Sequence, residues 1–472
     1  MDKVILVKTS PEYPDFPYEE TKTNNIFDSL KQIFFNLDLD KENYEKDNWN
    51  PFKNMVSEGG TVLIKPNWVL DCNPYNCGSL DGLITHTSLI KVIVDYVLKA
   101  INFKGKIIVG DSPLQSCNFD KLIKNNKVYE LFQNYSLKYK TVEFIIEDWR
   151  ITTFDLLSND IQKSKNIQIK NYKLIDLKKE SLLNDISDYS DLFRVSYYNS
   201  DLMKKHHNYE KNEYLVTGRI FEADFIVNIP KMKTHIKAGI TGGLKNLVGI
   251  NGHKEFLPHH IKGSYFEGGD NYINSSLFKR LFETYDEIVW RNIQKNKILK
   301  NKINFFILNI LKFFYKISSF DWCMTGSWSG NETIWRTTLD LNHILYFYDQ
   351  RNEELSNKKQ RNVLTIIDGI ISGEGEGPLT PVDKKTGLII GSFNPALTDA
   401  VQCQILGYNL SRVPTVYNAL YNIKSNFVLG KNEKIIVKII DNKKIHDKEL
   451  SELESYNFKV PYFWRRAKKQ IK

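Results

Sequence analysis

The 472-residue sequence contains few cysteines and no long hydrophobic run. Its five cysteines are sparse and odd in number, which argues against a disulfide framework. No segment reaches the roughly 20 apolar residues that a transmembrane helix needs. The first ten residues, MDKVILVKTS, lack the apolar core and the small-residue cleavage site of a signal peptide. We therefore expect a cytoplasmic protein.

The sequence also lacks arginine-rich blocks, nucleic-acid-binding motifs and internal repeats. Its 65 Lys and Arg residues against 56 Asp and Glu residues give a formal charge of +9, a mild excess for so long a chain. Such a balance is typical of a solvated lysine- and glutamate-rich surface, so we expect no nucleic-acid partner. Hydrophobic residues make up 42% of the chain, which fits a globular protein with a buried core.

Short apolar runs recur along the chain, and each ends in a polar turn with glycine or proline. The segments are TVLIKPNWV at 61–69, KIIVGDSP at 106–113, ADFIVNIPKMKTH at 223–235, NVLTIIDGIISGEGEGPLTP at 362–381 and GLIIGSFNPALTDA at 387–400. Such runs suit strands buried on both faces, and helix-like patterns such as residues 88–100 lie between them. The sequence therefore predicts an α/β fold with a largely parallel sheet and helices on both faces. Since ligands bind beyond the carboxyl ends of the strands in such sheets, we expect all five turns at one edge.

The composition changes along the chain suggest six portions. They are an N-terminal α/β portion at 1–119, a polar insertion or smaller subdomain at 120–215, a core with a glycine-rich motif at 216–295, an aromatic and basic helical segment at 296–320, a C-terminal α/β portion at 321–445 and a basic tail at 446–472.

The glycine-rich motif KTHIKAGITGGLKNLVGI, at 233–250, is the strongest candidate for an active site. His235 can exchange protons near neutral pH. Lys245 can hold a phosphate or carboxylate, or form a covalent attachment. Backbone amides at Gly242 and Gly243 are expected to begin a helix and to face an anion, with Thr241 as the helix cap. The alternative is an ordinary tight turn with an exposed histidine and lysine.

Further candidate residues lie in the same turns and in two other segments. The expected ligand-binding residues are Lys65, Asn67, Asp111, Ser112, Lys231, Lys233, Thr234, Gly242, Gly243, Asn246, Arg336, Asp368, Glu374 and Glu376. Glu374 and Glu376 are expected on a flexible loop, where they bind a divalent cation, act as acid and base, or are merely solvated. Arg336 either pairs with Asp340, four residues on, or grips an anionic ligand.

His253, His259 and His260 are candidate metal ligands, because imidazole suits zinc or nickel. Their spacing matches no structural zinc pattern, and an ordinary surface loop is the alternative.

Residues 296–320 combine lysines with many aromatic residues, as does the C-terminal YFWRRAKKQIK. We expect peripheral contact with a membrane surface through these two segments. A lid or a dimer-contact helix is the alternative for residues 296–320, and the sequence does not predict the oligomeric state.

Several motifs in order identify a family. KPN at 65–67, GDSP at 110–113, NIPKMKTH with TGGLKNLVG at 228–249, GGD at 268–270, WSGNETIWRTTLDLN at 328–342 and DGIISGEGEGP at 368–378 together resemble the domain-of-unknown-function family DUF362 of bacteria and archaea. Some members of that family carry iron–sulfur motifs. This chain has no such cysteine cluster, so we expect no iron–sulfur cluster.

Residues 235–245, H-x-x-A-G-x-T-G-G-x-K, also resemble a segment of the nickel-pincer lactate racemases. That resemblance implies an acid–base role for His235 and a covalently attached pincer cofactor on Lys245. It also implies a nickel-binding histidine in the region of His259 or His260, and His86 is the candidate second catalytic histidine. The racemases' Asp-x-Thr-Arg-Pro segment is missing here, and the metal, if present, is nickel or magnesium.

Three functions remain open. The first is an enzyme that acts on an anionic small molecule (a hydroxy acid, a sugar acid or a phosphorylated compound) by racemisation or epimerisation. The second is a metal- or phosphate-dependent transferase or ligase in surface-glycan assembly. The third is a protein that binds an anion without catalysis.

Overall fold

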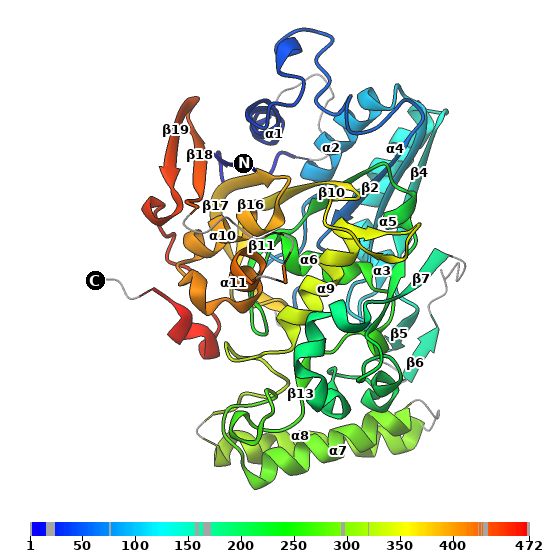
Figure 1. The fold of residues 1–472 in the computed structure, drawn as a ribbon, viewed down its shortest axis with the longest axis vertical. Coiled ribbons are helices and arrows are strands. Elements are labelled where there is room, and N and C mark those ends of the chain that lie inside the picture. The colour runs from blue at the N-terminus through cyan, green and yellow to red at the C-terminus, as the bar shows by residue number, and fades with distance from the viewer. Residues whose placement is uncertain are drawn as a thin grey trace.

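One large mixed sheet organises the chain in this computed structural model (Figure 1). The structure describes residues 2–469 except 16–23, 75–76, 156–159, 164–170, 294–297, 320, 423, 426 and 428–432. The strands follow the order β19-β18-β1-β17-β16-β10-β2-β3-β4, and β11 and β12 attach beside β16. Their bounds are β1 Val4–Lys8, β2 Thr61–Pro66, β3 Gly105–Asp111, β4 Val142–Asp148, β10 Phe225–Ile229, β11 Lys231–His235, β12 Gly239–Thr241, β16 Asn362–Glu376, β17 Thr380–Ser392, β18 Ile436–Asp441 and β19 Lys444–Glu449.

Helices cover both faces of this sheet. Their bounds are α1 Asn25–Asn36, α2 Thr87–Ala100, α3 Phe119–Asn125, α4 Val128–Lys138, α5 Arg219–Glu222, α6 Gly243–Asn246, α7 Leu277–Ile293, α8 Ile298–Ser318, α9 Ile334–Phe347, α10 Pro395–Leu406 and α11 Pro414–Tyr421. Alternate residues of a strand enter different cores: Ile5 and Val7 pack with α1 to α4, whereas Val4 and Leu6 join the core of α6, α9, α10 and α11. The predicted α/β fold, with a largely parallel sheet and helices on both faces, is confirmed.

The apolar runs at 61–64, 107–109, 225–229 and 363–367 form β2, β3, β10 and β16, which pair in parallel. β17 is antiparallel to β16, with Thr365 opposite Ser392. The turn after β17 therefore lies at the opposite edge, and the expectation that all five turns share one edge is wrong for residues 393–400. The first residues also form a central strand, β1, between β18 and β17.

Residues 120–215 contribute to the main sheet and to smaller ones. α3, α4 and the edge strand β4 come first. Strands β5 to β9 follow: β5 (Thr152–Asp155) pairs with β6 (Asp160–Lys163), β7 (Tyr172–Asp176) pairs with β9 (Glu213–Thr217), and β8 (Phe193–Arg194) pairs with β13 (His260–Ile261). Short strands β14 (Tyr348–Asp349) and β15 (Glu354–Leu355) form a further pair.

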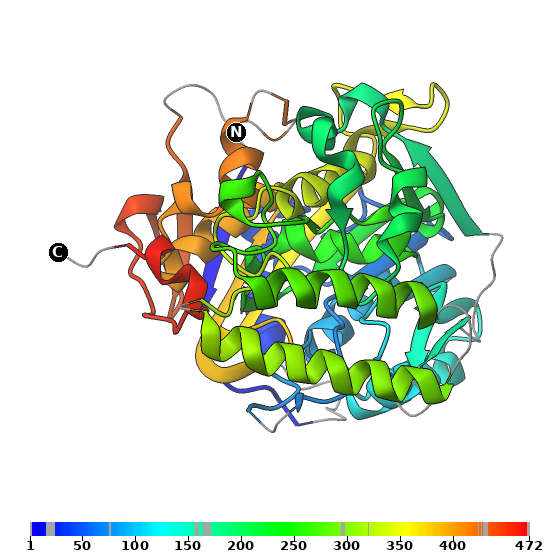
Figure 2. The same ribbon diagram turned by 90° about the horizontal axis from the view of Figure 1, so that it is seen from below.

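α7 and α8 form a hairpin at the end of the molecule away from the sheet (Figures 1 and 2). The expected helical segment at 296–320 corresponds to α8, and residues 294–297 and 320 lie outside the described residues. Over the part of the chain that the structure describes, no helix combines the length and the apolar character required to cross a bilayer.

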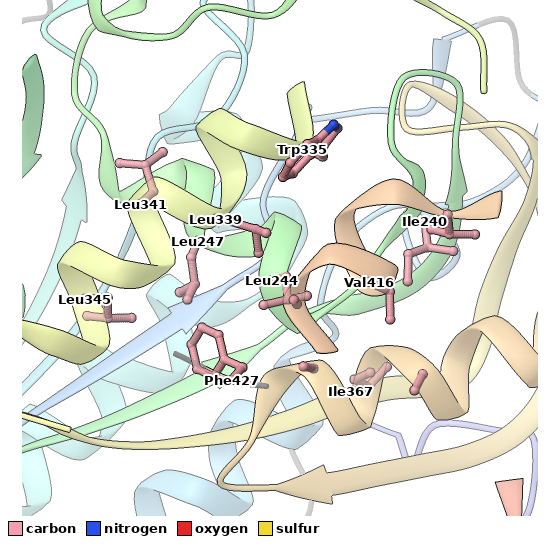
Figure 3. Close-up of a cluster of buried hydrophobic side chains, with 14 of the residues drawn as sticks. Ile240, Leu244, Leu247, Trp335, Leu339, Leu341, Leu345, Ile367, Val416 and Phe427 are labelled. Atoms are coloured by element: carbon pink, nitrogen blue, oxygen red, sulfur yellow. The ribbon is translucent and has the colours of Figure 1, made fainter. Parts of the chain in front are cut away.

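The glycine-rich motif is anchored by its apolar residues. Leu244 of α6 and Leu247 beyond it lie among α9, α10 and α11, where Leu339 and Phe427 are also buried (Figure 3). These leucines are fully buried, so the polar side chains of the same segment are left to face the other way.

Candidate functional site

A cavity of about 280 Å³ lies at the carboxyl ends of the parallel strands. Asn67 and Trp68 follow β2, and Asp111 and Ser112 follow β3. His235, Lys237 and Thr241 come from the β11–β12 pair, and Lys245 and Asn246 come from α6. The remaining walls include residues 195–197, 248–249, 251–254, 257, 259, 325 and 378–379. His235 and Lys245 thus face one shared cavity.

The glycine pair does not present its amides to this cavity. Backbone N–H groups of Gly243 and Leu244 donate to the carboxylate of Asp399 of α10, at 2.5 and 3.0 Å. A Cβ at position 242 would lie 2.3 Å from that carboxylate, so glycine is required by the close approach of Asp399. The expected anion site at Gly242 and Gly243 is therefore filled by an internal carboxylate. Thr241 is not the helix cap either, because Gly242 holds that position.

His235 is held in one tautomer. Its Nδ1 accepts hydrogen bonds from the backbone amides of Lys237 and Ala238, at 3.0 and 3.2 Å. Burial, followed by the charge of Lys245, holds the pKa of His235 well below its usual value, so the ring is neutral. With Nδ1 engaged as an acceptor, the proton belongs on Nε2. His235 therefore offers the cavity a hydrogen-bond donor.

His259 has the opposite tautomer. Its Nδ1 lies 2.7 Å from the carbonyl oxygen of Leu257, so Nδ1 carries the proton and donates. Burial, followed by the charges of Lys237 and Lys245, holds the pKa of His259 well below its usual value. Nε2 of His259 is consequently an unprotonated acceptor on a residue that lines the same cavity as His235.

The other two candidate metal ligands have different surroundings. His253 lines the cavity, but its Nδ1 lies 3.1 Å from Glu255 and its Nε2 lies 3.3 Å from the hydroxyl of Tyr198. His260 lies on β13 and is not among the lining residues. No group of three or more His, Cys, Asp and Glu side chains with the arrangement of a metal site occurs among the described residues.

Three lysines that line the cavity form no ion pair within the described part of the chain. Nζ of Lys237 donates to Ser196 Oγ at 3.1 Å and to the carbonyl of Thr325, and Nζ of Lys254 donates to the carbonyl of Ser196 at 3.0 Å. Nζ of Lys245 has no hydrogen-bond partner among those residues. Burial lowers the pKa of Lys237 to about 7 and the pKa values of Lys245 and Lys254 to about 8.

Four buried polar atoms on lining residues also lack a hydrogen-bond partner in the described structure. They are Asn67 Oδ1, Trp68 Nε1, Ser112 Oγ and Thr241 Oγ1. Buried polar groups are nearly always satisfied, so these four atoms are hydrogen-bonding groups left open on residues beside the cavity.

Asp111 does not balance the three lysines, because it already has its own cation. Its Oδ1 lies 2.7 Å from Nζ of the buried Lys65, and it also accepts from the amides of Trp68 and Ser112. Asn246 bridges Asn67 and Asn228, at 3.0 and 2.8 Å. These contacts fix the cavity floor at the ends of β2 and β3.

Several predicted site residues lie outside the cavity, in a second polar cluster. Lys231 pairs with Asp368 at 2.6 Å, and both side chains are fully buried. Tyr13 donates to Asp368 at 2.7 Å, and His86 stacks on the ring of Tyr13 at 3.8 Å. His86 therefore does not share a cavity with His235. Two more predicted ligand-binding residues of β11 make other internal hydrogen bonds: Lys233 donates to the carbonyl of Leu83, and Thr234 donates to the carbonyl of Gly375.

The glutamates of the GEGEG run do not lie on a loop. They belong to β16, and Glu374 and Glu376 accept from the backbone amides of Lys459 and Tyr462 at 2.9 and 2.8 Å. They tie the C-terminal segment to the sheet, which corrects the expectation of a metal or acid–base loop.

Arg336 does not form the expected pair with Asp340. It pairs with Glu332 at 2.9 Å and stacks on Trp335, whereas Asp340 accepts from Ser181, Leu182 and Tyr214. Arg336 is not among the residues that line the cavity.

Lys237 and Lys254 are cavity residues that the sequence interpretation missed. Both lie in segments already singled out, at positions two after His235 and one after His253. Nothing in their local pattern distinguishes a cavity lysine from a solvated one.

Residues 180–404 match the model of a domain of unknown function, DUF362. No curated protein matches the chain. Among solved structures, a crystal structure of a Thermotoga maritima protein from a structural genomics programme is similar, with 12% sequence identity and a TM-score of 0.31. The match covers 78% of this chain and 56% of that one, so this chain spans just over half the length of the Thermotoga protein.

Proposed function

We propose that this chain, whose residues 180–404 match the DUF362 model, is an enzyme that transfers a proton on a small organic anion. The anion would occupy the cavity between His235 and Lys245, and its chemistry is that of a carboxylate or a phosphate. The observation that carries this proposal is the excess of lysines over carboxylates on the cavity walls.

The case for an anion rests on missing negative charge. Lys237, Lys245 and Lys254 line one small cavity without an ion-pair partner among the described residues, and their pKa values are lowered by burial. A bound anion would stabilise the ammonium form of each lysine and so raise these pKa values. Trp68, Ser112 and Thr241, which line the same cavity, carry buried neutral donors without a partner among the described residues.

The case for proton transfer rests on the two histidines. Nε2 of His259 would remove a proton from the carbon next to a carboxylate or carbonyl group, and the electrons of the C–H bond would move onto the oxygen. The Nε2–H of His235 would donate a hydrogen bond to that oxygen, as a neutral imidazole can. Return of the proton to the carbon restores the ligand. Proton exchange at such a carbon is the step that racemases and epimerases share, so we favour an isomerase.

Lys245 also suits a covalent cofactor. Its amine has no partner among the described residues and its pKa is lowered to about 8, so about a tenth of the amine is neutral and nucleophilic at pH 7, far more than for an ordinary lysine. Lys245 would hold a pincer-type cofactor through its amine, and the chemistry that such a group would supply is that of a hydride acceptor. The intact mass of protein purified from cells that make the cofactor tests this: an added mass on Lys245 is expected, and an unmodified chain would rule the cofactor out.

A thermal-shift panel tests the ligand class. Hydroxy acids, sugar acids and phosphorylated sugars are compared with uncharged sugars of the same size, and with nucleotide sugars plus Mg²⁺ for the transferase alternative. An anion at roughly 100 times its Kd should stabilise the protein by about 2.7 kcal/mol. Lys237→Met should weaken that response, and the matched surface variant Lys359→Met should not. Equal stabilisation by neutral sugars would contradict anion binding.

Solvent-deuterium incorporation, followed by NMR with the stabilising anion, tests catalysis. Exchange at one carbon is expected in the wild type and should be lost in His259→Gln. Stabilisation by the anion without any exchange would identify a non-catalytic binding protein and end the proposal of proton transfer.

A further inference from the structure

We propose that the exposed face of α8 binds the surface of an anionic lipid bilayer. This inference is independent of the cavity chemistry. It rests on the arrangement of apolar and charged side chains along α8, which lies on the outside of the molecule (Figure 2).

Apolar side chains form a continuous stripe on α8. Its members are Ile303, Phe306, Ile310, Phe313, Phe314 and Ile317, and all are exposed. Phe306 is 65% exposed and Phe313 is 61% exposed. At 3.6 residues per turn, these six positions fall within an arc of about 100°, the width of the apolar face that a helix usually buries.

Phe314 stacks on Phe278 of α7 at 5.2 Å, at the edge of the stripe, but the main packing side of α8 is a different one. Asn304, Leu308 and Tyr315 are buried and lie on roughly the opposite side of the helix. Asn304 accepts from Tyr285 of α7 at 2.9 Å, and Tyr315 packs edge-on against Phe282 at 5.2 Å. The helix is thus fixed by α7 and directs a second apolar side outward.

The charges around the stripe favour an anionic partner. Residues 298–318 contain no Asp or Glu, and the exposed Lys302, Lys312 and Lys316 lie along one flank of the stripe. Glu283 and Glu287 of α7 are occupied by inward contacts, to Asn271 and Arg194. An aromatic stripe beside lysines is the pattern of helices that lie in the headgroup region of anionic membranes.

The C-terminal segment extends this surface. Exposed Trp322 lies 4.5 Å from the ring of Tyr462, so the residues after α8 and the tail form one aromatic group. Arg465 and Arg466 beside it are exposed. Tyrosine and tryptophan with neighbouring arginines are favoured at the membrane–water boundary.

The same hairpin touches the cavity wall. Trp290 of α7 contacts Tyr197, a cavity residue, with ring centroids 5.8 Å apart, and Lys237 donates to Thr325, seven residues after the end of α8. Docking of α8 on a bilayer would therefore place the cavity close to the membrane surface.

Co-sedimentation of the full chain with phosphatidylcholine vesicles, with and without phosphatidylglycerol, tests the proposal. Binding is expected to be strong only with phosphatidylglycerol. Phe306→Ser/Phe313→Ser should reduce the partition coefficient roughly ten-fold or more. Lys312→Glu/Lys316→Glu should reduce it more than roughly ten-fold at low salt.

Two matched control variants distinguish binding through the apolar stripe of α8 from non-specific adsorption to the vesicles. Leu137→Ser on α4 removes an equally exposed apolar side chain, and Lys124→Glu/Lys140→Glu removes two exposed lysines elsewhere. Both should bind as the wild type does, and circular dichroism checks that every variant is folded. Absence of wild-type binding to phosphatidylglycerol vesicles, or a dimer in solution that Phe306→Ser/Phe313→Ser dissolves, would overturn the proposal.

Discussion

Replacing Lys245 by methionine should stabilise the ligand-free protein and remove its response to anions. Methionine has a similar length and shape but no charge. Lys245 lines the cavity, carries no partner within the described residues and has a pKa lowered by burial to about 8. The buried ammonium therefore lowers the free energy of unfolding of the wild type, and the methionine variant lacks this destabilisation.

The pKa of Lys245 sets an upper bound on that cost. At about 1.4 kcal/mol per pH unit, a fall from 10.5 to about 8 corresponds to about 3 kcal/mol. The entropy of unfolding, roughly 2.1 cal/mol/K per residue, amounts to about 1 kcal/mol/K for 472 residues. We therefore expect Lys245→Met to raise Tm by up to about 3 °C.

The difference in Tm between Lys245→Met and the wild type should decrease as the pH rises. Below pH 8 the lysine is charged in both states, so the full cost is present. Between pH 8 and 10.5 the folded protein releases the proton before the unfolded chain does, and the cost declines. The difference in Tm should thus be largest near pH 6 to 7 and should vanish above about pH 10.5. Differential scanning calorimetry across this range measures it.

The same substitution at Lys231 is the control. Lys231 is fully buried and pairs with Asp368 at 2.6 Å, so Lys231→Met would leave that carboxylate without its cation. Breaking a buried pair costs about 3 to 5 kcal/mol, so Tm should fall. A lower Tm for Lys245→Met at pH 6, or an intact thermal shift with the stabilising anion, would refute the account of an uncompensated cavity lysine.

Three further predictions follow from the contacts around the cavity. His259→Gln should slow proton exchange at least 100-fold, roughly the contribution of a general base, while the anion-induced thermal shift is retained; normal exchange would exclude His259 as the base. Asp399→Ala leaves the amides of Gly243 and Leu244 unpaired and should cost about 3 kcal/mol in urea unfolding; a smaller loss is expected for Asp399→Asn, whose one carbonyl oxygen can still accept from one of the two amides. Gly249→Ala places a Cβ 2.1 Å from Asp111 Oδ1 and 2.8 Å from Lys65 Nζ, so the buried pair must separate and Tm should fall; an unchanged Tm would show that this floor is not rigid.

The strands that end at the cavity were predictable because their continuous apolar sequence is what burial on both faces of the sheet requires. β2, β3 and β10 are short apolar runs that are buried on both faces, and each ends in the turn that the sequence indicated. Parallel pairing then brings Lys65 and Asp111 together without further information. His235 and Lys245 share the cavity because the antiparallel β11–β12 pair leads directly from His235 to α6, which carries Lys245.

Contacts between distant segments were not predictable. The GEGEG run has the composition of a loop, but a Cβ at Gly373 would lie 2.5 Å from the carbonyl of Gly82, so its glycine serves close packing within a strand. Glu374 bonds to Lys459, 85 residues away. The amides of Gly243 and Leu244 likewise find Asp399, more than 150 residues on. Capping by a distant carboxylate leaves no local signal, which is why the glycine pair was interpreted as an anion site.

The buried lysines fall into two groups, paired and unpaired, that the sequence does not distinguish. Lys65, near the end of β2, and Lys231, at the start of β11, belong to the same polar motifs as Lys237 and Lys245, yet the first two are paired with Asp111 and Asp368. A buried ammonium without an ion-pair partner reduces stability, so the unpaired lysines are unfavourable for folding. Lys237, Lys245 and Lys254 face the same cavity, together with the donor tautomer of His235 and the acceptor tautomer of His259. A folding requirement does not account for this combination, whereas a ligand that brings its own negative charge does.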